Sequence, residues 1–425
     1  MKKLKAAELD STFYSNAEIT IPGIVPQIID DIRQRGDESL RQYTREFDDC
    51  TLDTFQVAPE EIHAAWSSMD EELLIHLKKA ADRIESFSRK QLGSFRSFEV
   101  EIEPGVLAGQ RIIPIERAGC YVPGGRYPLV SSVLMSAIPA RVAGVKEVAL
   151  FSPPSKTGKI SLPILAAAEI AGVTEVYAIG GAQAVAAMAF GTESIKPVCK
   201  VVGPGNIYVN AAKKLVYGQV GVDFIAGPTE ILIIADESAN PSFVAADLIA
   251  QAEHDVQARP ILLTSSTDLA DAVDEEIKNQ LESLQTAETA RHSLQENGVI
   301  ILFKKVEEAV EITNRRAPEH CQLCVKNPEL YEEKLMNYGS LFVGVLAPET
   351  LGDYSSGLNH ILPTNGAAKY TGGLSVKDFL KIQTYLKVDQ EGFKHIAPAA
   401  ATMAHAEGLY GHEQAIRLRE KNLPG

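Results

Sequence analysis

"EVYAIGGAQAVAAMAFG", residues 175–191, carries the pattern on which the predicted fold depends. Its first five residues are typical of a short buried strand, and the two glycines that follow mark a tight turn. The alanine-rich run after the turn favours a helix. A strand that leads through a glycine turn into a helix is one half of a β–α–β unit, in which neighbouring strands run parallel.

The same order repeats on both sides of this stretch. Short strand-like segments that end in proline or glycine occur at "EVALFSPP" (147–154) and "VCKVVGPG" (198–205), and a helical run follows the second. The pattern resumes with "EILIIAD" (230–236) and continues as far as "GSLFVG" (339–344). These repeats predict an α/β protein in which mostly parallel sheets carry helices on both faces, with right-handed crossovers.

The remaining segments are less regular. Residues 23–95 have apolar residues at helical spacing, and residues 97–122 contain alternating segments typical of strands. We expect residues 1–19 to form a short N-terminal arm. Residues 350–374 are a glycine-rich loop region, and residues 375–425 are expected to form a helical C-terminal tail. A chain of 425 residues is too long for one hydrophobic core, so more than one domain is expected.

The charge balance and the cysteines narrow the range of partners and compartments. The chain has 41 basic and 56 acidic residues and a net charge of −15. Nucleic acids and anionic membranes require a basic face, so we expect neither as a partner. The N-terminus lacks the apolar segment of a secretory signal, and the five cysteines are few and scattered. These features predict a cytoplasmic protein with reduced thiols.

The stretch "APEHCQLCV" (317–325) is the first candidate for chemistry. Glu319 and His320 are adjacent, directly after a proline that favours a turn. Two such side chains could serve successive proton transfers, but they could equally be polar residues in solvent at a helix-to-strand junction. Cys321 and Cys324 form a C-x-x-C. Residues three apart on a strand face opposite sides, so we interpret these cysteines as buried structural thiols.

A candidate metal site lies in "AADLIAQAEHD" (245–255). Gln251 and His254 are three residues apart on a predicted helix, so both side chains point to one face and could reach one ion. The alternative is a solvated helix end. Asp353 and His360 lie in the glycine-rich loop region, where a ligand contact and a simple Asx turn are both reasonable.

Two further features admit a functional and a structural interpretation. Glu407 and His412 flank a glycine break in the tail, which could aim both side chains at a site or could interrupt a solvated helix. "AIGGAQAV" (178–185) and "VVGPGNIY" (201–208) each run from a strand through glycines into a helix. The backbone N–H groups at such helix starts can bind phosphate, although tight turns without a ligand look the same.

Taken together, these stretches resemble the histidinol dehydrogenase family of zinc- and NAD-dependent enzymes. The resemblance extends from about residue 30 to the end of the chain, and the matching runs follow the family's order. Each run is weak alone, but the set is specific. The runs are "YVPGGRYPLVSSVLM" (121–135), "GGAQAVAAMAFGTESI" (180–195), "GPGN" (203–206), "AGPTEILIIAD" (226–236), "DLIAQAEHD" (247–255), "APEH" (317–320), "GDYSSGLNHILPT" (352–364) and "AEGLYGH" (406–412).

The resemblance implies a metal site and a substrate site. The positions that match the family's ligands for one zinc ion per subunit are Gln251, His254, Asp353 and His412. The positions that match contacts to the substrate are Thr229, Gln251, His254, His320, Asp353, His360, Glu407 and His412. In the family, Glu407 and His412 reach the site of the other subunit, which implies a homodimer. Thr229 stands where many family members carry serine, and it keeps the hydroxyl.

The resemblance also implies the NAD contacts and the domain organisation. Tyr121, Gln183 and Asn206 match contacts to NAD. The implied fold has two incomplete Rossmann-like domains with parallel sheets, between the N-terminal arm and the C-terminal tail. The expected boundaries are 121–228 for the NAD-binding domain, and 20–120 together with 229–374 for the other, discontinuous domain.

The implied reaction is the four-electron oxidation of L-histidinol to L-histidine through L-histidinaldehyde, with two NAD⁺ and one water, in the last steps of histidine biosynthesis. We expect His320 to remove the hydroxyl proton and Glu319 to activate the water that hydrates the aldehyde. One alternative is a related zinc- and NAD-dependent dehydrogenase of another diol, such as sulfopropanediol. Others are a metal-dependent hydrolase, which would not need NAD⁺, and a non-catalytic binding protein on an α/β scaffold.

Overall fold

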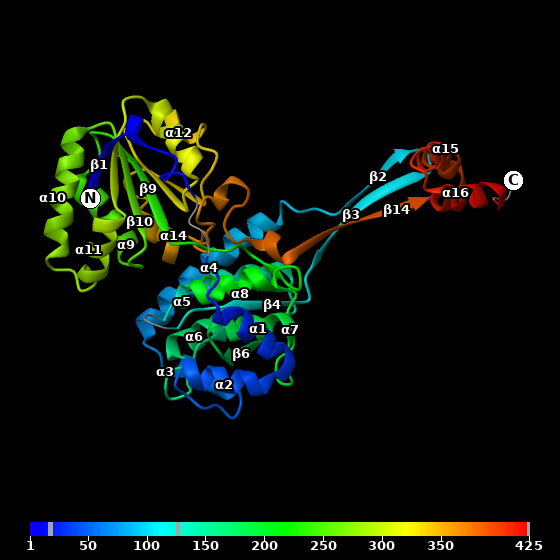
Figure 1. Cartoon of the computed structure of the whole chain (residues 1–425), viewed down its shortest axis with the longest axis horizontal. Helices are drawn as coiled ribbons and strands as arrows, with labels where there is room; N and C mark the ends of the chain where they lie inside the picture. The colour runs from blue at the N-terminus through cyan, green and yellow to red at the C-terminus, as the bar shows by residue number, and fades with distance from the viewer. Residues whose placement is uncertain (16–19, 125–127, 423–425) are drawn as a thin grey trace.

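The computed structural model describes residues 1–15, 20–124 and 128–422. Within these residues the chain forms two α/β bodies and an arm that projects away from both, and the C-terminal helices lie at the far end of the arm (Figure 1). Residues 125–127, which belong to the "YVPGGRYPLVSSVLM" run, lie outside the described residues, and so do residues 16–19 of the expected arm.

The first body contains a six-stranded parallel sheet in the order β1-β11-β10-β9-β12-β13. Alternate residues of its central strand pack on opposite faces, Ile231 and Ile233 on one and Leu232 and Ile234 on the other. The strands are β1 (Lys2–Lys5), β9 (Glu230–Ala235), β10 (Arg259–Thr264), β11 (Val299–Leu302), β12 (His320–Cys324) and β13 (Ser340–Val343). The main helices are α9 (Pro241–Ala252), α10 (Thr267–Leu281), α11 (Ala287–Glu296) and α12 (Val306–Arg316).

The N-terminal segment is part of this sheet and not a separate arm. Lys2–Lys5 pair in parallel with Val299–Leu302 along the edge of the sheet. The N-terminal ammonium donates a hydrogen bond to Asp274 Oδ1 over 3.0 Å, which anchors the strand. Without β1, strand β11 would be the edge of the sheet and its outer backbone groups would be unpaired, so even a short segment with a polar sequence can extend the ladder.

The second body contains a five-stranded parallel sheet in the order β6-β5-β4-β7-β8. In this sheet β4 lies between β5 and β7, and in the six-stranded sheet β9 lies between β10 and β12. In both cases the earliest of these strands in the chain is flanked by the later ones, as in a Rossmann-like half. The strands are β4 (Arg117–Tyr121), β5 (Glu147–Ser152), β6 (Glu175–Ala178), β7 (Lys200–Val202) and β8 (Gly221–Val222). Their helices are α5 (Val130–Ala143), α6 (Leu162–Ala171), α7 (Gly181–Phe190) and α8 (Ile207–Val216).

The four N-terminal helices pack on this second body, which differs from the expected grouping of residues 20–120 with 229–374. Helices α1 and α2 share a core with α7 and α8, and helices α3 and α4 share a core with α5 and α6. Their amphipathic faces therefore cover the two sides of the five-stranded sheet (Figure 1). The helices are α1 (Ile24–Arg35), α2 (Asp37–Phe47), α3 (Pro59–Ser68) and α4 (Glu71–Leu92).

The arm is an antiparallel sheet in the order β14-β3-β2, and two helices cap its far end (Figure 1). The expected helical C-terminal tail is confirmed in two helices, and residues Leu380–Val388 before them form a strand that pairs with β3 along its whole length. The elements are β2 (Phe98–Glu103), β3 (Val106–Pro114), β14 (Leu380–Val388), α15 (Gln390–Ala406) and α16 (Tyr410–Asn422).

Across the three described ranges, no helix combines the length and the apolar character that crossing a membrane requires.

Candidate active site

The candidate active site lies at the amino ends of β9 and β12, two neighbouring strands of the six-stranded sheet. Helix α12 ends at Ala317, whose φ of 53° turns the chain, and Pro318 follows before β12 begins. The register pairs His320 of β12 with Ile231 of β9, so the starts of both strands meet. Glu319 and His320 are 6% and 3% exposed. The pair is therefore buried at a turn, and the interpretation as solvated polar residues was wrong.

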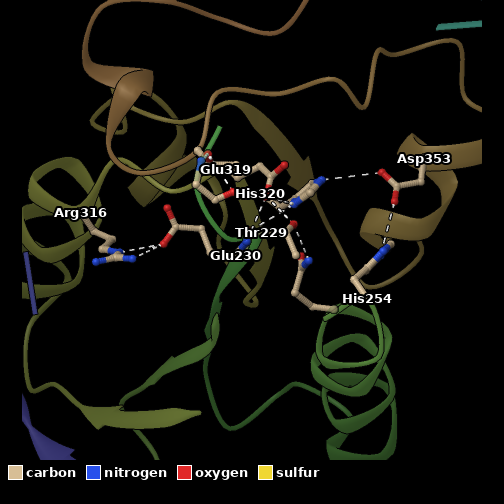
Figure 2. A network of polar contacts seen from close by, with 10 residues as sticks. Thr229, Glu230, His254, Arg316, Glu319, His320 and Asp353 are labelled. Carbon is tan, nitrogen blue, oxygen red and sulfur yellow. Dashed lines mark hydrogen bonds and ion pairs between the residues drawn. The ribbon is translucent and has the colours of Figure 1, made fainter. Parts of the chain in front are cut away.

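A short chain of hydrogen bonds holds the Glu319 carboxylate. Its Oε2 accepts from Thr229 Oγ1 over 2.5 Å and from the backbone N of Glu230 over 2.9 Å. Gln251 Nε2 donates in turn to Thr229 Oγ1 over 2.8 Å (Figure 2). Helix α9 leaves the carboxyl end of β9 and runs back along the sheet, so its last turn delivers Gln251 to the amino edge. Thr229 thus links the helix to the carboxylate through its hydroxyl.

The imidazole of His320 lies between two carboxylates. Its Nδ1 is 3.2 Å from the carbonyl oxygen of Glu230 and 3.7 Å from Glu319 Oε2. Its Nε2 is 3.7 Å from Asp353 Oδ1 and, among the described residues, has no hydrogen-bond partner (Figure 2). The Nδ1 contact fixes the ring, and the Nε2 atom remains available to another molecule.

Three acidic or imidazole groups next to this ring could hold a metal ion. His254, Glu349 and Asp353 each offer an atom, and these atoms lie within 4.8 Å of one another. His254 Nε2 is 4.0 Å from Asp353 Oδ2. The cluster combines nitrogen and carboxylate ligands, which suit zinc.

Unpartnered polar atoms support a cation at this cluster. Gln251 is fully buried, and its Oε1 finds no hydrogen-bond partner among the residues that the structure describes. The same holds for both carboxylate oxygens of Glu349, which is 1% exposed. Buried acceptors of this kind are costly unless a donor or a cation satisfies them. The residues present therefore fit a divalent cation.

Glu349 was missed in the sequence, although a signal was there. Residues Glu349–Tyr354 form the helix α14, so Asp353 lies on a helix and not in the loop that the glycines suggested. Residues four apart on a helix share a face, which brings Glu349 and Asp353 together. The spacing E-x-x-x-D directly after Pro348, a common helix start, could have revealed the pair.

Burial controls the protonation of these groups. It raises the pKa of Glu319 to about 7, against the opposing effects of His320 and the Thr229 hydroxyl. It raises the pKa of Glu349 to about 8. Burial alone would lower the pKa of His320, but the Glu319 carboxylate outweighs it, with Asp353 and Glu349 assisting, and the pKa rises to about 10. Loss of water thus raises the pKa of the two carboxyl groups, and the surrounding carboxylates raise that of His320.

A buried ion pair lies next to Glu319 and His320, between the end of α12 and the start of β9. Arg316, at the end of α12, donates through Nε to Glu230 Oε2 over 2.8 Å (Figure 2). Its Nη1 donates to the carbonyl of Phe13 over 2.7 Å. The pair ties the turn before β12 to the start of β9. It supports the backbone that carries Glu319 and His320.

His360 connects this site to the second body. Its Nδ1 is 2.9 Å from the carbonyl oxygen of Asp353, and its Nε2 is 3.1 Å from Ser132 Oγ of α5. The neighbouring Asn359 donates to the carbonyl of Met135, also in α5, over 2.7 Å. His360 therefore lies where the two bodies meet, next to the metal-binding candidates.

Glu407 and His412 lie far from these residues within one chain. Both are exposed, Glu407 at the end of α15 and His412 in α16, at the outer end of the arm (Figure 1). A single chain does not bring them to the site, so their assignment as substrate and metal contacts stays a prediction.

The three predicted NAD contacts lie in the second body, at the carboxyl ends of its strands. The Tyr121 hydroxyl, at the end of β4, accepts from the backbone N of Gly181 over 3.1 Å. Gln183 is buried in the first turn of α7, and Asn206 caps α8 by accepting from the N–H groups of Tyr208 and Val209. Carboxyl ends beside the central strand are the usual place for a nucleotide in such a sheet.

The C-x-x-C behaves as expected for buried thiols on a strand. Cys321 packs in the core on one face of the six-stranded sheet, and Cys324 packs in the core on the other face. The two sulfur atoms therefore point apart, and the interpretation as structural thiols is confirmed.

Comparison with known proteins identifies the family of this chain. The sequence model of the histidinol dehydrogenase family matches residues 14–420. A histidinol dehydrogenase from Agrobacterium fabrum is 47% identical over 93% of this chain and 91% of its own length. One from Methanothermobacter thermautotrophicus is 45% identical over 93% of both chains.

A solved structure gives the same result. The crystal structure of histidinol dehydrogenase from Elizabethkingia anophelis superposes with a TM-score of 0.94 at 38% identity, over 99% of this chain and 98% of that one. These matches do not favour a dehydrogenase of another diol or a metal-dependent hydrolase. The chain belongs to the histidinol dehydrogenase family.

Proposed function

We propose that this enzyme oxidises L-histidinol to L-histidine through L-histidinaldehyde, with two NAD⁺ and one water, in histidine biosynthesis. The observation that carries the proposal is the buried Glu319–His320 pair beside unpartnered metal-binding atoms. An acid–base pair next to a cation site can remove two protons in succession from one bound substrate. A cytoplasmic location is also proposed, in keeping with the free thiols of all five cysteines.

In the first half-reaction, His320 removes the proton of the substrate hydroxyl. The available Nε2 faces Asp353 and the metal-binding candidates, so a hydroxyl bound there would lie within its reach. As the O–H proton moves to His320, the carbon loses its hydride, and the alcohol becomes an aldehyde. NAD⁺, when bound, accepts that hydride.

In the second half-reaction, Glu319 removes a proton from the water that attacks the aldehyde carbon. A pKa of about 7 gives this carboxyl the strength of a general base near neutral pH. The aldehyde oxygen takes back the proton that His320 holds, which gives a hydrate and leaves His320 free to act as a base again. The hydrate carbon then loses a second hydride, which a second NAD⁺ would accept when bound, while His320 takes a hydroxyl proton. The acid then leaves with the oxygen of the water. Thr229 and the N–H of Glu230 hold the carboxylate in place throughout.

The proposed metal is zinc, one per subunit, held by Gln251, His254 and Asp353 together with His412 of the partner subunit. Glu349 is an additional candidate in the same cluster. When bound, the cation would neutralise carboxylates that raise the pKa of His320, and it would hold the substrate's imidazole. Thr229 and His360 line the same space and are proposed as substrate contacts.

A homodimer is proposed because Glu407 and His412 of the tail lie far from the candidate site of their own chain. Large apolar side chains are exposed along the arm and its helices, which is unusual unless another surface covers them. Those with the greatest exposure are Phe98, Ile102, Ile382, Leu386, Met403, Tyr410 and Leu418. In the proposed dimer, Glu407 and His412 of the partner subunit complete each site.

Mixing two inactive variants tests the shared site. His320→Asn removes a group of the body, and His412→Asn removes a group of the tail. In each hybrid dimer one of the two sites would combine an intact body with an intact tail, so we expect about half of the parent activity per hybrid. A statistical mixture, in which about half of the dimers are hybrids, should have about a quarter. The measurement is NADH formation after the two variants are unfolded and refolded together. Activity that stays at the level of the separate variants would refute a site shared between subunits.

NADH production from L-histidinol, measured with and without a chelator, tests the reaction itself. We expect about two NADH per histidine formed, loss of turnover in the presence of the chelator, and recovery on addition of zinc. Sulfopropanediol, supplied in parallel, should give little NADH. Turnover without NAD⁺, or turnover that is indifferent to the chelator, would contradict the proposal.

A further inference from the structure

The turn between β7 and α8, Gly203–Pro204–Gly205, is built for one backbone conformation. Gly203 has a φ of 115°, and a Cβ at this position would lie 2.1 Å from the carbonyl oxygen of Tyr121. The turn therefore lies directly against the end of β4, where any residue but glycine would clash. It leads straight into Asn206, the cap of α8.

Three buried side chains form hydrogen bonds with the backbone of this turn. Lys213 Nζ donates to the carbonyl oxygen of Gly203 over 2.9 Å, and Asp223 Oδ2 accepts from the N–H of Gly203 over 2.8 Å. Asn210 Nδ2 donates to the carbonyl oxygen of Gly205 over 2.8 Å. Both backbone groups of Gly203 are thus fixed by side chains from α8 and from the segment after β8.

Lys213 and Asp223 also form an ion pair with each other, and the side chain of each is only 1% exposed. A buried ion pair is seldom the most stable filling for its volume, because apolar side chains of similar size often serve as well or better. What apolar side chains cannot do is orient a peptide group. The bonds of this pair to the N–H and carbonyl of one glycine therefore point to a positioning role.

We propose that the Lys213–Asp223 pair is a positioning device for NAD: it fixes the orientation of the Gly203–Gly205 turn so that Asn206 can contact the dinucleotide. This inference rests on the proposed function, because it takes Asn206 and Tyr121 as parts of the NAD site. Neither Lys213 nor Asp223 is expected to touch NAD, since both are buried beneath the turn.

The double variant Lys213→Met/Asp223→Leu tests the inference. Removing both partners avoids the uncompensated buried charge that a single substitution would leave. We expect the KM for NAD⁺ to rise about tenfold or more, while the KM for L-histidinol and the bound zinc change less than about twofold. A KM for NAD⁺ that stays within about twofold of the parent in the folded variant would overturn the proposal.

The control is an ion pair at the amino ends of the strands of the same sheet, in which the Glu175 side chain is 19% exposed. Arg117 is 5% exposed at the start of β4 and donates to Glu175 of β6 over 2.7 and 3.0 Å. Arg117→Met/Glu175→Leu should lower the midpoint of thermal unfolding and leave the KM for NAD⁺ unchanged. An equal rise of that KM in both double variants would mean general destabilisation and would also overturn the proposal.

A milder variant guards against failure to fold. Lys213→Met/Asp223→Asn keeps the side-chain volume of Asp223 and an oxygen that can accept from Gly203 N–H. It should raise the KM for NAD⁺ less than the Leu variant does. A KM equal to that of the parent would count against positioning by Lys213.

Asn206→Ala separates this inference from the proposed NAD site. If Asn206→Ala raises the KM for NAD⁺ and the Lys213–Asp223 variants do not, only the positioning role fails. If Asn206→Ala leaves the KM unchanged, the NAD site itself fails, and the positioning role fails with it.

Discussion

The two parallel sheets share one strand order but present their polar residues at opposite ends. In the five-stranded sheet, Tyr121 and Asn206 follow the carboxyl ends of β4 and β7. In the six-stranded sheet, Thr229 and Glu319 precede the amino ends of β9 and β12. The usual rule for open α/β sheets places ligands at carboxyl ends, where the strand order reverses. Of the two proposed sites, only the one at the five-stranded sheet follows this rule.

The difference shows which groups are available at the amino edge of a sheet, the edge formed by the amino ends of its parallel strands. Helix α9 starts after the carboxyl end of β9 and returns, so Gln251 and His254 reach the amino edge from the far end of a helix. Backbone N–H groups at strand starts are not all used by the ladder, and that of Glu230 binds the Glu319 carboxylate. A carboxyl edge suits phosphate at helix N-termini. An amino edge, reached by returning helices, suits buried acids and a cation.

The largest effect expected at the amino edge is that of Glu319→Gln. An amide can still accept from Thr229 and Glu230, so the geometry should survive while the base is lost. We expect the conversion of aldehyde to histidine to slow by about 10²- to 10⁴-fold. Oxidation of supplied histidinol to aldehyde should slow by less than about tenfold. Single-turnover NADH formation from histidinol and from histidinaldehyde measures the two steps separately, and equal losses in both would contradict separate roles for Glu319 and His320.

Much of this comparison was readable in the sequence, but not all of it. The strands and the turns after them were predicted because apolar runs and glycines are local signals. The pairing of Lys2–Lys5 with Val299–Leu302 was not predicted, since the sequence of a polar four-residue segment does not indicate which distant strand it pairs with. Helices α1–α4 show amphipathic faces, but the sequence does not say which sheet those faces cover.

In the arm and the metal cluster, by contrast, the sequence carried local signals that were not used. "LKIQTYLKV" (380–388) alternates apolar and polar residues, so the strand β14 was readable and was overlooked in favour of the helical surroundings. Glu349 could have been found from its spacing to Asp353. Its burial could not, because that depends on the packing of α14 against α9.

An intermediate effect is expected for Glu349→Gln, which tests whether the cation belongs to the amino edge. Removing one carboxylate should weaken zinc binding by about 10- to 100-fold, since the remaining ligands stay in place. The check is zinc content after dialysis against chelators of graded strength. Glu253→Gln is the charge-matched control, because Glu253 adjoins His254 but its Oε2 is engaged by Thr286. If both variants lose zinc equally, the cluster acts only through its total charge and Glu349 has no direct contact.

The smallest effect concerns Asp48, a half-buried acid in the second body. Asp48, which ends α2, has an Oδ2 that is buried and, as far as the described ranges show, without a hydrogen-bond partner. Burial raises its pKa to about 6, and its charge in turn contributes to the raised pKa of Tyr121. Glu319 accepts two hydrogen bonds, whereas among the described residues none is donated to Asp48 Oδ2 to compensate for the loss of water.

The sign of the resulting pH dependence follows from proton binding. Between pH 4 and about 6 the folded chain holds a proton on Asp48 that the unfolded chain has released, so the unfolding free energy falls as pH rises through this window. Asp48→Asn removes that dependence. We expect the variant to unfold about 1–3 °C higher than the parent at pH 8 and at the parent's temperature at pH 4, as measured by calorimetry. Asp49→Asn, at the exposed neighbouring position, should show no such difference. A gain that is the same at both pH values would mean that the amide stabilises through packing, and the contrast between compensated acids at the amino edge and an uncompensated one in the second body would not hold.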